Sequence, residues 1–407
     1  MTLSPAANPA GTHLRGHYQP THFPMTILNK IKAQRQDKVA VICGEESITY
    51  AELYRRMRNA EPLPLPLLGT SWEGDFRLHT TGTTGKAKTV VVSQKAMMAN
   101  TDNLIRGHGY TEDTAFIIAG DMTHLGCWSK IFPVLATGGT LLILKDGMKD
   151  TEAFFAALDL LPGRRYATFL VPANIRILLQ FSAGRLARYA DRIDFIETGA
   201  APMPHSDMQH LCRLLPHSRL YNTYASTETG VVATYNYNDG RCLPGCLGKP
   251  LPHSSVTITP DGRIACGGDT LMSGYEPDPV PPHGGVFVTN DNGFIDGEGM
   301  LHILGRNDDI INVGGYKVAP TEVEEAALSL PAVSDCICIP LPHPILGQAP
   351  ALLVVTAEGH AFDKRAIARH IAGRLTERYK VPLTYRQVAR IERTDNGKLN
   401  RKFYVDR

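Results

Sequence analysis

The sequence predicts a mixed α/β fold: a large N-terminal domain with helix-covered, mostly parallel sheets, a small antiparallel β subdomain, and a small α+β C-terminal domain. The chain has 407 residues, enough for two or three domains with ordinary cores. From residue 76 to 246 short apolar runs alternate with helix-length segments, which is typical of a parallel sheet covered by helices. From 246 to 305 short runs are separated by Gly, Pro and Asp turns, which indicates the antiparallel subdomain.

The front of the chain predicts two helices. A loosely ordered leader over 1–24 precedes a helix-like stretch over 26–36. Thr49 is a suitable N-cap for a helix that runs to Asn59, with Glu52 at the capping-box position. Alternating prolines follow this helix and cannot continue it, so a connector is expected there.

Apolar runs and an amphipathic pattern give the remaining elements. Continuous apolar runs of this length are typical of buried strands. The runs lie at 39–43, 89–92, 115–119, 140–144, 167–171 and 194–198, and an amphipathic helix is expected over 363–379.

Composition excludes several classes of partner. Lys plus Arg number 42 against 40 for Asp plus Glu, a formal charge of +2, so neither a nucleic acid nor an anionic membrane is expected as a partner. No apolar run approaches the roughly 18 to 20 residues of a membrane span. Residues 1–24 hold no apolar core of a secretory signal. We therefore expect a cytoplasmic protein.

The eight cysteines do not form a disulfide framework in a chain of this length. Cys242 with Cys246, and Cys336 with Cys338, invite a metal site, but neither pair has the C-x2-C spacing of a zinc site. The second pair lies in an apolar run, where buried thiols behave as small hydrophobes. We therefore expect reduced cysteines and no structural metal.

A loop rich in glycine and threonine is the most informative segment. It reads Thr-Thr-Gly-Thr-Thr-Gly-Lys-Ala-Lys-Thr over 80–89 and precedes three valines. Glycines let backbone amides turn inward, and hydroxyl and ammonium groups add donors for phosphate oxygens. The Walker A pattern does not fit in register. On the loop alone, phosphate binding and an ordinary glycine-rich turn between strands both stay open.

This loop resembles the nucleotide-phosphate loop of the acyl-adenylate-forming superfamily, which comprises acyl- and aryl-CoA synthetases, adenylation domains of peptide synthetases, and luciferases. The family usually ends the loop in Pro-Lys-Gly, whereas here Lys88 lies between Ala87 and Thr89. The early Thr-Tyr-x-Glu-Leu motif is present over 49–53. The resemblance implies nucleotide-binding roles for Thr81, Gly82, Thr83, Thr84, Gly85, Lys86 and Lys88.

A second motif, over 121–126, resembles the family segment that borders the carboxylate site. It places His124 among the catalytic residues, although a histidine in an ordinary loop would look the same. Amino-acid-activating members carry Asp where Leu125 stands, and an apolar residue cannot offset the desolvation of an ammonium group. An α-amino acid substrate is therefore disfavoured. The resemblance implies an acid pocket of His124, Gly126, Val171, Asn174 and Tyr224.

Two later motifs imply the adenosine and metal contacts. The turn Thr-Gly-Ala-Ala-Pro resembles the adenine-binding turn, through Gly199, Ala200 and Ala201. The segment over 221–228 resembles the family's most recognisable motif, in which Tyr224 stacks on adenine, Thr227 contacts the α-phosphate and Glu228 holds Mg2+. Thr227 and Glu228 are thus counted as catalytic. The alternative for Glu228 is a carboxylate favoured by a helix dipole.

The last motifs imply a ribose site, a hinge and a catalytic lysine. Asp291 would accept hydrogen bonds from ribose hydroxyls, with Asn290 replacing a glycine and tolerating the positive φ of a turn. Arg306 would also bind the ribose. Asp308 would be the interdomain pivot. Further residues expected from the resemblance are Gly314 and Gly315 in a pantetheine tunnel and Lys398, which completes the adenylation site.

The expected domain boundaries follow from these motifs. They are a poorly ordered leader (1–24), an N-terminal AMP-binding domain (25–305, with the antiparallel subdomain at about 246–305), a hinge (306–309) and a mobile C-terminal domain (310–407). Family members have a long α/β segment between the early motif and the phosphate loop, but here the interval is only 60–79. Uncovered sheet edges would need the leader or a second subunit, so a homodimer is expected.

The resemblance implies ATP-dependent activation of an organic acid, aryl or otherwise non-amino, to an acyl-AMP that is transferred to CoA. ATP and Mg2+ are the expected cofactors, with CoA as co-substrate. One alternative delivers the acyl group to a carrier-protein pantetheine, an amine or a reductase. A second alternative is a non-catalytic nucleotide- or metabolite-binding relic.

Overall fold

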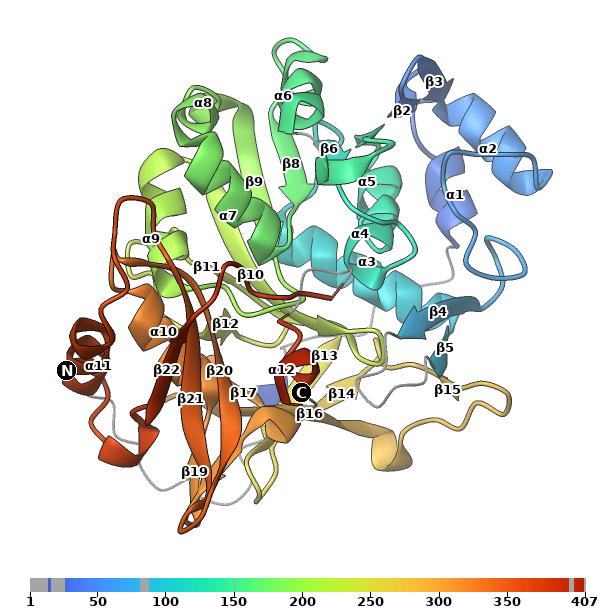
Figure 1. The fold of residues 1–407 in the computed structure, drawn as a ribbon. Helices are drawn as coiled ribbons and strands as arrows, with labels where there is room; N and C mark the ends of the chain where they lie inside the picture. Colours follow the sequence, from blue (N-terminus) through green and yellow to red (C-terminus); the bar gives the residue numbers. More distant parts are fainter. Residues whose placement is uncertain (1–13, 16–25, 81–87, 150, 395–398, 406–407) are drawn as a thin grey trace.

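A twisted eight-stranded sheet forms the centre of the molecule (Figure 1). The computed structural model describes residues 14–15, 26–80, 88–149, 151–394 and 399–405. In spatial order the strands are β11 (Gly230–Asn236), β10 (Arg219–Ser226), β9 (Ile193–Thr198), β8 (Tyr166–Phe169), β6 (Ala115–Ile118), β7 (Thr140–Ile143), β2 (Val39–Cys43) and β3 (Glu46–Thr49). The six inner strands run parallel, and β11 and β3 are antiparallel edges. The mostly parallel sheet is confirmed.

Helices cover both faces of this sheet, which explains the continuous apolar runs. In β6, Phe116 and Ile118 belong to one core with α3 (Gln94–His108) and α5 (Ile131–Thr137). Ala115 and Ile117 belong to a second core, on the opposite face. The helices on that side are α6 (Thr151–Asp159), α7 (Pro172–Phe181) and α9 (His205–Leu214). Because every side chain of such a strand is buried, no alternation survives in the sequence.

The shortened front of the chain covers the edge of the sheet. Helix α1 (Ile27–Lys32) and helix α2 (Tyr50–Arg58) flank the β2–β3 hairpin, and Thr49 caps α2 as predicted. The connector buries Trp72 against Phe132, with ring centroids 6.4 Å apart. The connector thus covers part of the apolar surface at this edge of the sheet. A homodimer stays a prediction.

One predicted strand lies in a different sheet. The run over 89–92 forms β5 (Lys88–Val92), which pairs antiparallel with β4 (Phe76–Thr80) and β15 (Gly274–Tyr275) rather than joining the parallel sheet. Placing it in the parallel sheet was wrong. Only seven residues separate β4 from β5, and a parallel connection needs a longer crossover.

The antiparallel subdomain is a six-stranded sheet in the order β1-β13-β14-β16-β17-β12. Its strands are β13 (Ser254–Ile258), β14 (Arg263–Gly268), β16 (Val286–Ile295), β17 (Leu301–Arg306), β12 (Cys246–Gly248) and β1 (Leu14–Arg15). The strand β1 lies within the predicted leader: Leu14 and Arg15 pair with β13, while the rest of 1–24 lies outside the described residues, so the leader itself stays a prediction.

A short 3-10 helix, Asn307–Asp309, leads into the C-terminal unit. This unit contains β18 (Ile311–Val313), β19 (Tyr316–Val318), β20 (Val333–His343), β21 (Gly347–Thr356) and β22 (Thr384–Gln387), with helices α10 (Pro320–Leu328), α11 (Lys364–Arg374) and α12 (Lys402–Val405). Helix α11 is shorter than the predicted range of 363–379. It ends before Leu375, whose backbone is extended. Gly373 and Thr376, which are weak helix formers, lie at this end. Among the described residues no helix is long and apolar enough to cross a membrane.

Candidate active site

Four of the predicted site segments meet at one edge of the central sheet. Strands β6, β8, β9 and β10 are parallel neighbours, so the segments that follow their carboxyl ends emerge on the same side. These segments carry His124, Val171, the turn over 199–202, and Thr227 with Glu228. The topology therefore brings together the acid pocket and the adenine and phosphate residues proposed from the sequence.

The ring of Phe169 fills the space between two predicted site glycines. A Cβ on Gly126 would lie 2.9 Å from Phe169 Cε1, and one on Gly199 would lie 3.7 Å from Cε2 of the same ring. A Cβ on Gly199 would also lie 2.8 Å from the Thr223 carbonyl oxygen. Both glycines are thus required by close packing, and Phe169 separates the acid segment from the adenine turn. No motif in the sequence pointed to Phe169.

The adenine turn has an unusual backbone. Ala200 has φ of +67°, a left-handed conformation that non-glycine residues rarely adopt. Such conformations cluster at functional sites, because the surrounding structure must stabilise them. The turn directly follows β9, whose last residue, Thr198, is fully buried.

Tyr224 connects the predicted adenine and ribose contacts. Its hydroxyl donates to Asp291 Oδ2 at 2.8 Å and lies 3.2 Å from Thr289 Oγ1. Burial, followed by the charge of Asp291, raises the pKa of Tyr224 well above its usual range, so the phenol stays protonated. The aromatic ring of β10 and the carboxylate of β16 are thereby fixed relative to each other.

Glu228 is joined to the end of the phosphate loop through Tyr275. The Tyr275 hydroxyl donates to Glu228 Oε1 at 3.0 Å, and Lys88 Nζ lies 4.8 Å from the centre of the Tyr275 ring. Burial, and then Glu228, raise the pKa of the Tyr275 phenol. The pairing of β15 with β5 brings Tyr275 to this place, and no sequence motif singled it out.

The described residues fit a hydrated cation rather than a protein cage. They contain no group of three or more His, Cys, Asp and Glu side chains able to hold a metal ion. Glu228 offers one carboxylate oriented by Tyr275. Mg2+ keeps several waters and is commonly held by one or two carboxylates plus substrate phosphates, so a single carboxylate suits it.

His124 is half-exposed at the start of α4 (Leu125–Trp128). Its Nε2 lies 3.7 Å from Asp121 Oδ2, and its side chain makes no cap hydrogen bond. Thr123 donates from its backbone N–H and its hydroxyl to Asp121 Oδ1, each at 2.8 Å. The imidazole is therefore accessible at the sheet edge, and its place in an acid pocket stays a prediction. Asn174, in the first turn of α7, is half-buried.

The predicted ribose and hinge residues are neighbours in the antiparallel subdomain. Asp291 and Arg306 are directly opposite each other in the pairing of β16 with β17. The expected positive-φ turn at Asn290 was wrong, because this residue lies within β16 and is not left-handed. Asn290 instead donates from Nδ2 to Asp308 Oδ2 at 2.5 Å. The side chain thus connects β16 to the short helix Asn307–Asp309.

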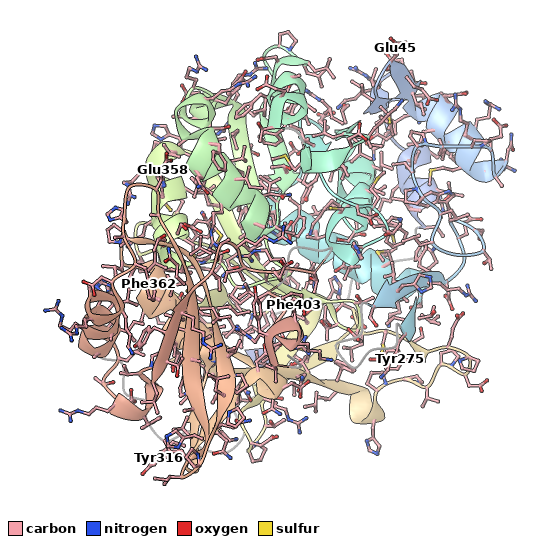
Figure 2. All side chains as sticks on the ribbon, in the orientation of Figure 1. Glu45, Tyr275, Tyr316, Glu358, Phe362 and Phe403 are labelled. Atoms are coloured by element: carbon pink, nitrogen blue, oxygen red, sulfur yellow. The ribbon has the colours of Figure 1, made fainter. Side chains whose placement is uncertain are left out.

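The predicted thiol loop lies apart from the nucleotide residues. Gly314 and Gly315 have φ of +57° and +93° between β18 and β19, and a Cβ on Gly315 would meet no atom within 4 Å. Figure 2 shows Tyr316, the next residue, at the end of the C-terminal unit remote from Tyr275. The structure therefore does not bring this loop to the nucleotide residues in the orientation it adopts.

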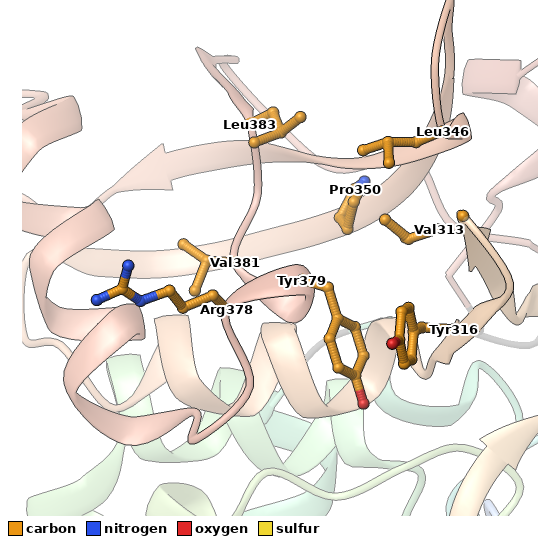
Figure 3. Close-up of a pocket in the computed structure, with 9 residues that line it drawn as sticks. Val313, Tyr316, Leu346, Pro350, Arg378, Tyr379, Val381 and Leu383 are labelled. Atoms are coloured by element: carbon orange, nitrogen blue, oxygen red, sulfur yellow. The ribbon is translucent and has the colours of Figure 1, made fainter.

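A cavity of about 180 Å³ adjoins the thiol loop (Figure 3). The rings of Tyr316 and Tyr379 stack beside it, with centroids 4.6 Å apart and planes inclined by 21°. Arg378 supplies a cationic group. The whole lining is Val313, Gly314, Tyr316, Leu346, Pro350, Arg378, Tyr379, Val381 and Leu383.

Two groups of predicted residues lie outside the described part of the chain. They are Thr81, Gly82, Thr83, Thr84, Gly85 and Lys86 of the phosphate loop, and Lys398. Their roles stay predictions. The flanking residues are described. Thr80 pairs with Lys88 at the end of the β4–β5 hairpin, and the backbones of Arg393 and Leu399 form an isolated antiparallel β-bridge.

A buried ion pair lies beneath the site and was missed from the sequence. Lys130 Nζ and Glu197 Oε1 are 2.7 Å apart, with side chains 2% and 1% exposed. His108 Nε2 lies 3.7 Å from Glu197 Oε2, and Lys130 Nζ lies 5.4 Å from the Phe169 ring centre. Desolvation lowers the pKa of His108 to about 4, so this imidazole is neutral near pH 7.

Comparison with known proteins agrees with this geometry. The model of the AMP-binding enzyme family matches residues 76–276, and that of the AMP-binding enzyme C-terminal domain matches 322–398. The chain belongs to the AMP-binding enzymes, the acyl-adenylate-forming superfamily. The two matched regions include the phosphate loop, the adenine turn, Glu228 and Lys398.

This AMP-binding protein is similar to curated ligases and to solved structures. It is 28% identical over 340 residues to indoleacetate–CoA ligase of Aromatoleum aromaticum, covering 79% of this chain and 65% of that protein. It is 27% identical to sulfoacetate–CoA ligase of Cupriavidus necator, covering 84% and 68%. The structure of ATP-bound MatB from Rhodopseudomonas palustris matches with a TM-score of 0.73 and 27% identity, covering 81% and 68%. The chain thus spans about two thirds of the length of these curated relatives.

Proposed function

We propose that this protein activates an organic, non-amino carboxylic acid with ATP and transfers the acyl group from the resulting acyl-AMP to the thiol of CoA. The observation that carries the proposal is the convergence of Tyr224, Asp291, Glu228 and Tyr275 around one edge of the central sheet. The names of the relatives support the same reaction, since both curated relatives described above are acid–CoA ligases.

In the first half-reaction the substrate carboxylate attacks the α-phosphorus of ATP, forming the acyl–phosphate bond and releasing pyrophosphate. Carboxylate and triphosphate repel each other, so positioning and charge neutralisation are the main tasks of the protein. Thr227 would contact the α-phosphate, and Glu228 would hold Mg2+. That ion, when bound, neutralises phosphate charge.

The adenosine would lie between the turn over 199–202 and the ring of Tyr224. Asp291 would accept hydrogen bonds from the ribose, and Arg306 on the opposing strand would donate to it. Lys88 lies over the ring of Tyr275, at the end of the phosphate loop and near Glu228. Lys398 would bridge the carboxylate and phosphate oxygens, and residues 81–86 would bind the pyrophosphate.

In the second half-reaction a thiol attacks the acyl carbonyl carbon and displaces AMP. Gly314 and Gly315 must then replace Lys398 at the site, which requires rotation about Asp308. CoA is favoured as the acceptor by the cavity beside this loop. Its stacked Tyr316 and Tyr379 suit a flat base, and Arg378 suits a phosphate. The phosphopantetheine arm of a carrier protein has a phosphate where it joins the protein but no base to lie against these rings.

The acid is proposed to be non-amino and compact. Leu125 gives no partner for an ammonium group, and Phe169 narrows the space between Gly126 and Gly199. The relatives named above act on indoleacetate and sulfoacetate, which are small acids without an α-amino group.

Acid-dependent pyrophosphate release across a panel of aryl, short aliphatic and amino acids, with and without CoA, tests this proposal. We expect release with at least one aryl or short acid, none with α-amino acids, and a thioester when CoA is present. Release without thioester formation would favour another acceptor. Failure to bind ATP with Mg2+ would contradict the enzyme and favour a non-catalytic relic.

A further inference from the structure

Asp335 lies between two arginines from different parts of the chain. Arg393 Nη2 donates to both of its carboxylate oxygens, at 3.0 and 2.7 Å. Arg176 Nη1 donates to Oδ1 at 3.0 Å. Arg176 belongs to α7 of the N-terminal domain, whereas Asp335 lies in β20 and Arg393 follows β22 in the C-terminal unit. The carboxylate therefore ties the two domains together, and we call these three residues the Asp335 clamp.

The clamp is partly shielded from water. The side chains of Arg176 and Asp335 are each 22% exposed, and that of Arg393 is 27% exposed. Burial opposes ionisation of Arg176, but Asp207 and Asp335 outweigh it and raise the pKa of the guanidinium. Charge-assisted hydrogen bonds of this kind are stronger than the exposed pairs elsewhere on the surface.

Local structure orients Asp335 and Arg176 toward each other. The pairing of β20 with β21 shifts register between Val333 and Asp335, and such irregularities re-aim a side chain. Arg176 is held from its other side by Asp207 of α9, with 3.2 Å between Nε and Oδ2. Helices α7 and α9 follow the β8 and β9 segments of the candidate site, so the clamp acts on the elements that carry that site. Figure 1 shows the orange and red C-terminal unit against these helices.

In the orientation held by the clamp, the predicted thiol loop is not at the candidate site. Tyr316 and the thiol loop are turned away from Tyr275, while Phe403 of the terminal helix lies near the middle of the molecule (Figure 2). Arg393 precedes Lys398 by five residues in the sequence. Transfer to a thiol requires the other orientation, in which the bonds between Arg176 and Asp335 must break.

We propose that Asp335 is a positioning residue for adenylation: by binding Arg176 and Arg393 together, it holds the C-terminal unit in the orientation of the first half-reaction. This inference rests on the proposed function. Breaking the clamp lowers the population of that orientation and leaves the chemistry of the second half-reaction intact.

Asp335→Asn and Arg176→Gln test the clamp through the two half-reactions separately. For both variants we expect acid-dependent ATP–pyrophosphate exchange to fall about tenfold, and thioester formation from supplied acyl-AMP and CoA to stay equal or rise. The double variant should lose less than the two single losses combined, because both variants remove the same bond between Arg176 and Asp335. Arg390→Gln is the matched control, since Arg390 is an exposed arginine whose ion pair is with Glu392 of the same segment.

Hydrogen exchange gives a readout that needs no activity. The amides of Glu392 and Asn400 donate to the Tyr404 hydroxyl and the Glu392 carbonyl, at 2.8 and 3.0 Å. We expect both amides to exchange faster in Asp335→Asn than in the wild type or in Arg390→Gln. Unchanged exchange there, or equal loss in both half-reactions, would overturn the clamp. Absence of pyrophosphate exchange in the wild type would instead overturn the proposed function, and the hydrogen-exchange comparison would still decide the clamp.

Discussion

The hydroxyl of Tyr275 donates a hydrogen bond to the carboxylate of Glu228, with 3.0 Å between the two oxygens. Tyr275 lies on β15, which pairs with the strand that ends the phosphate loop, whereas Glu228 lies in the turn between β10 and β11. The Tyr275 side chain therefore orients the proposed Mg2+ ligand with its hydroxyl, and its ring contacts the ammonium group of Lys88. The bond joins the residues proposed to bind the metal and the phosphates into a single unit.

Tyr275→Phe should raise the KM for ATP with Mg2+ about tenfold, because a hydrogen bond to a charged group contributes about 1.5 to 3 kcal/mol. The ring and its contact with Lys88 are kept in this variant. The KM for the acid should not change. Glu228→Gln should lower kcat/KM for ATP much further, by about 100-fold or more, since it removes the charge itself. Steady-state kinetics at varied Mg2+ measure the KM and kcat/KM of both variants. Equal effects of the two variants would contradict the proposal that Glu228 holds Mg2+ and Tyr275 only orients it.

Lys398→Ala should abolish adenylation selectively. The ammonium group is needed only where carboxylate and phosphate charges meet, so ATP–pyrophosphate exchange should fall by about 100-fold or more. Thioester formation from supplied acyl-AMP and CoA should survive. Measuring the two half-reactions in parallel checks this, and an equal loss in both would refute the assignment of Lys398 to the first step.

Asp308→Pro should leave adenylation near the wild-type rate and slow thiol transfer. Proline fixes φ, and rotation of the C-terminal unit about this residue needs a change of backbone dihedrals. Asp308→Ala is the control, because it removes the bond to Asn290 without fixing φ. Single-turnover assays of each step separate the effects. Wild-type rates in both steps of Asp308→Pro would show that the pivot lies elsewhere.

Gly126→Ala should destabilise the protein by about 1 to 3 kcal/mol, since the added methyl group would overpack the Phe169 ring. The variant should also accept smaller acids than the wild type. Gly184→Ala is a matched control: Gly184 lies in α8 (Ala183–Ala187), where a Cβ meets nothing within 4 Å. That change should stabilise slightly. Urea unfolding compares the two, and equal shifts would show that the close contact with Phe169 does not constrain residue 126.

The stability of the protein should fall as the pH drops from about 6.5 to 4. The folded pKa of His108 is lowered to about 4 by burial, and the charges facing it are Glu197, Lys130 and Arg219. A histidine with a depressed pKa contributes stability above its unfolded pKa and loses it at lower pH, here about 3 kcal/mol in total. His108→Gln should flatten this part of the profile.

Chemical denaturation at pH 7, 5.5 and 4.5 measures that profile. His360→Gln is the control, because His360 is exposed in a turn. If His108→Gln and wild type keep parallel profiles over this range, the buried imidazole does not titrate on unfolding as described.

Local signals in the sequence predicted much of the fold. Thr49 caps its helix as expected, and Cys336 and Cys338 are buried as small hydrophobes. The apolar run of β5 was recognised as a strand, but its sheet was not, because burial on both faces looks the same in either kind of sheet. The strand at Leu14 could not be foreseen, since its pairing with β13 joins residues far apart in the sequence.

The candidate site was predicted only where a motif carried it. Tyr224 and Asp291 came from separate motifs, and only the structure shows that they share a hydrogen bond. Phe169, Tyr275 and Asp335 carry no motif, because their roles depend on long-range packing and on the contact between domains. Asn290 was misjudged because a residue suited to a left-handed turn can equally donate from a strand.

The proposed function depends above all on adenosine binding between the turn over 199–202 and Tyr224, beside Asp291 and Glu228. A crystal structure with a non-hydrolysable acyl-adenylate analogue, in which a sulfamate replaces the phosphate, tests this directly. We expect the base against Ala200 and Tyr224, and the ribose within hydrogen-bond distance of Asp291. An analogue bound elsewhere, with these residues left in contact only with solvent and protein, would contradict the account.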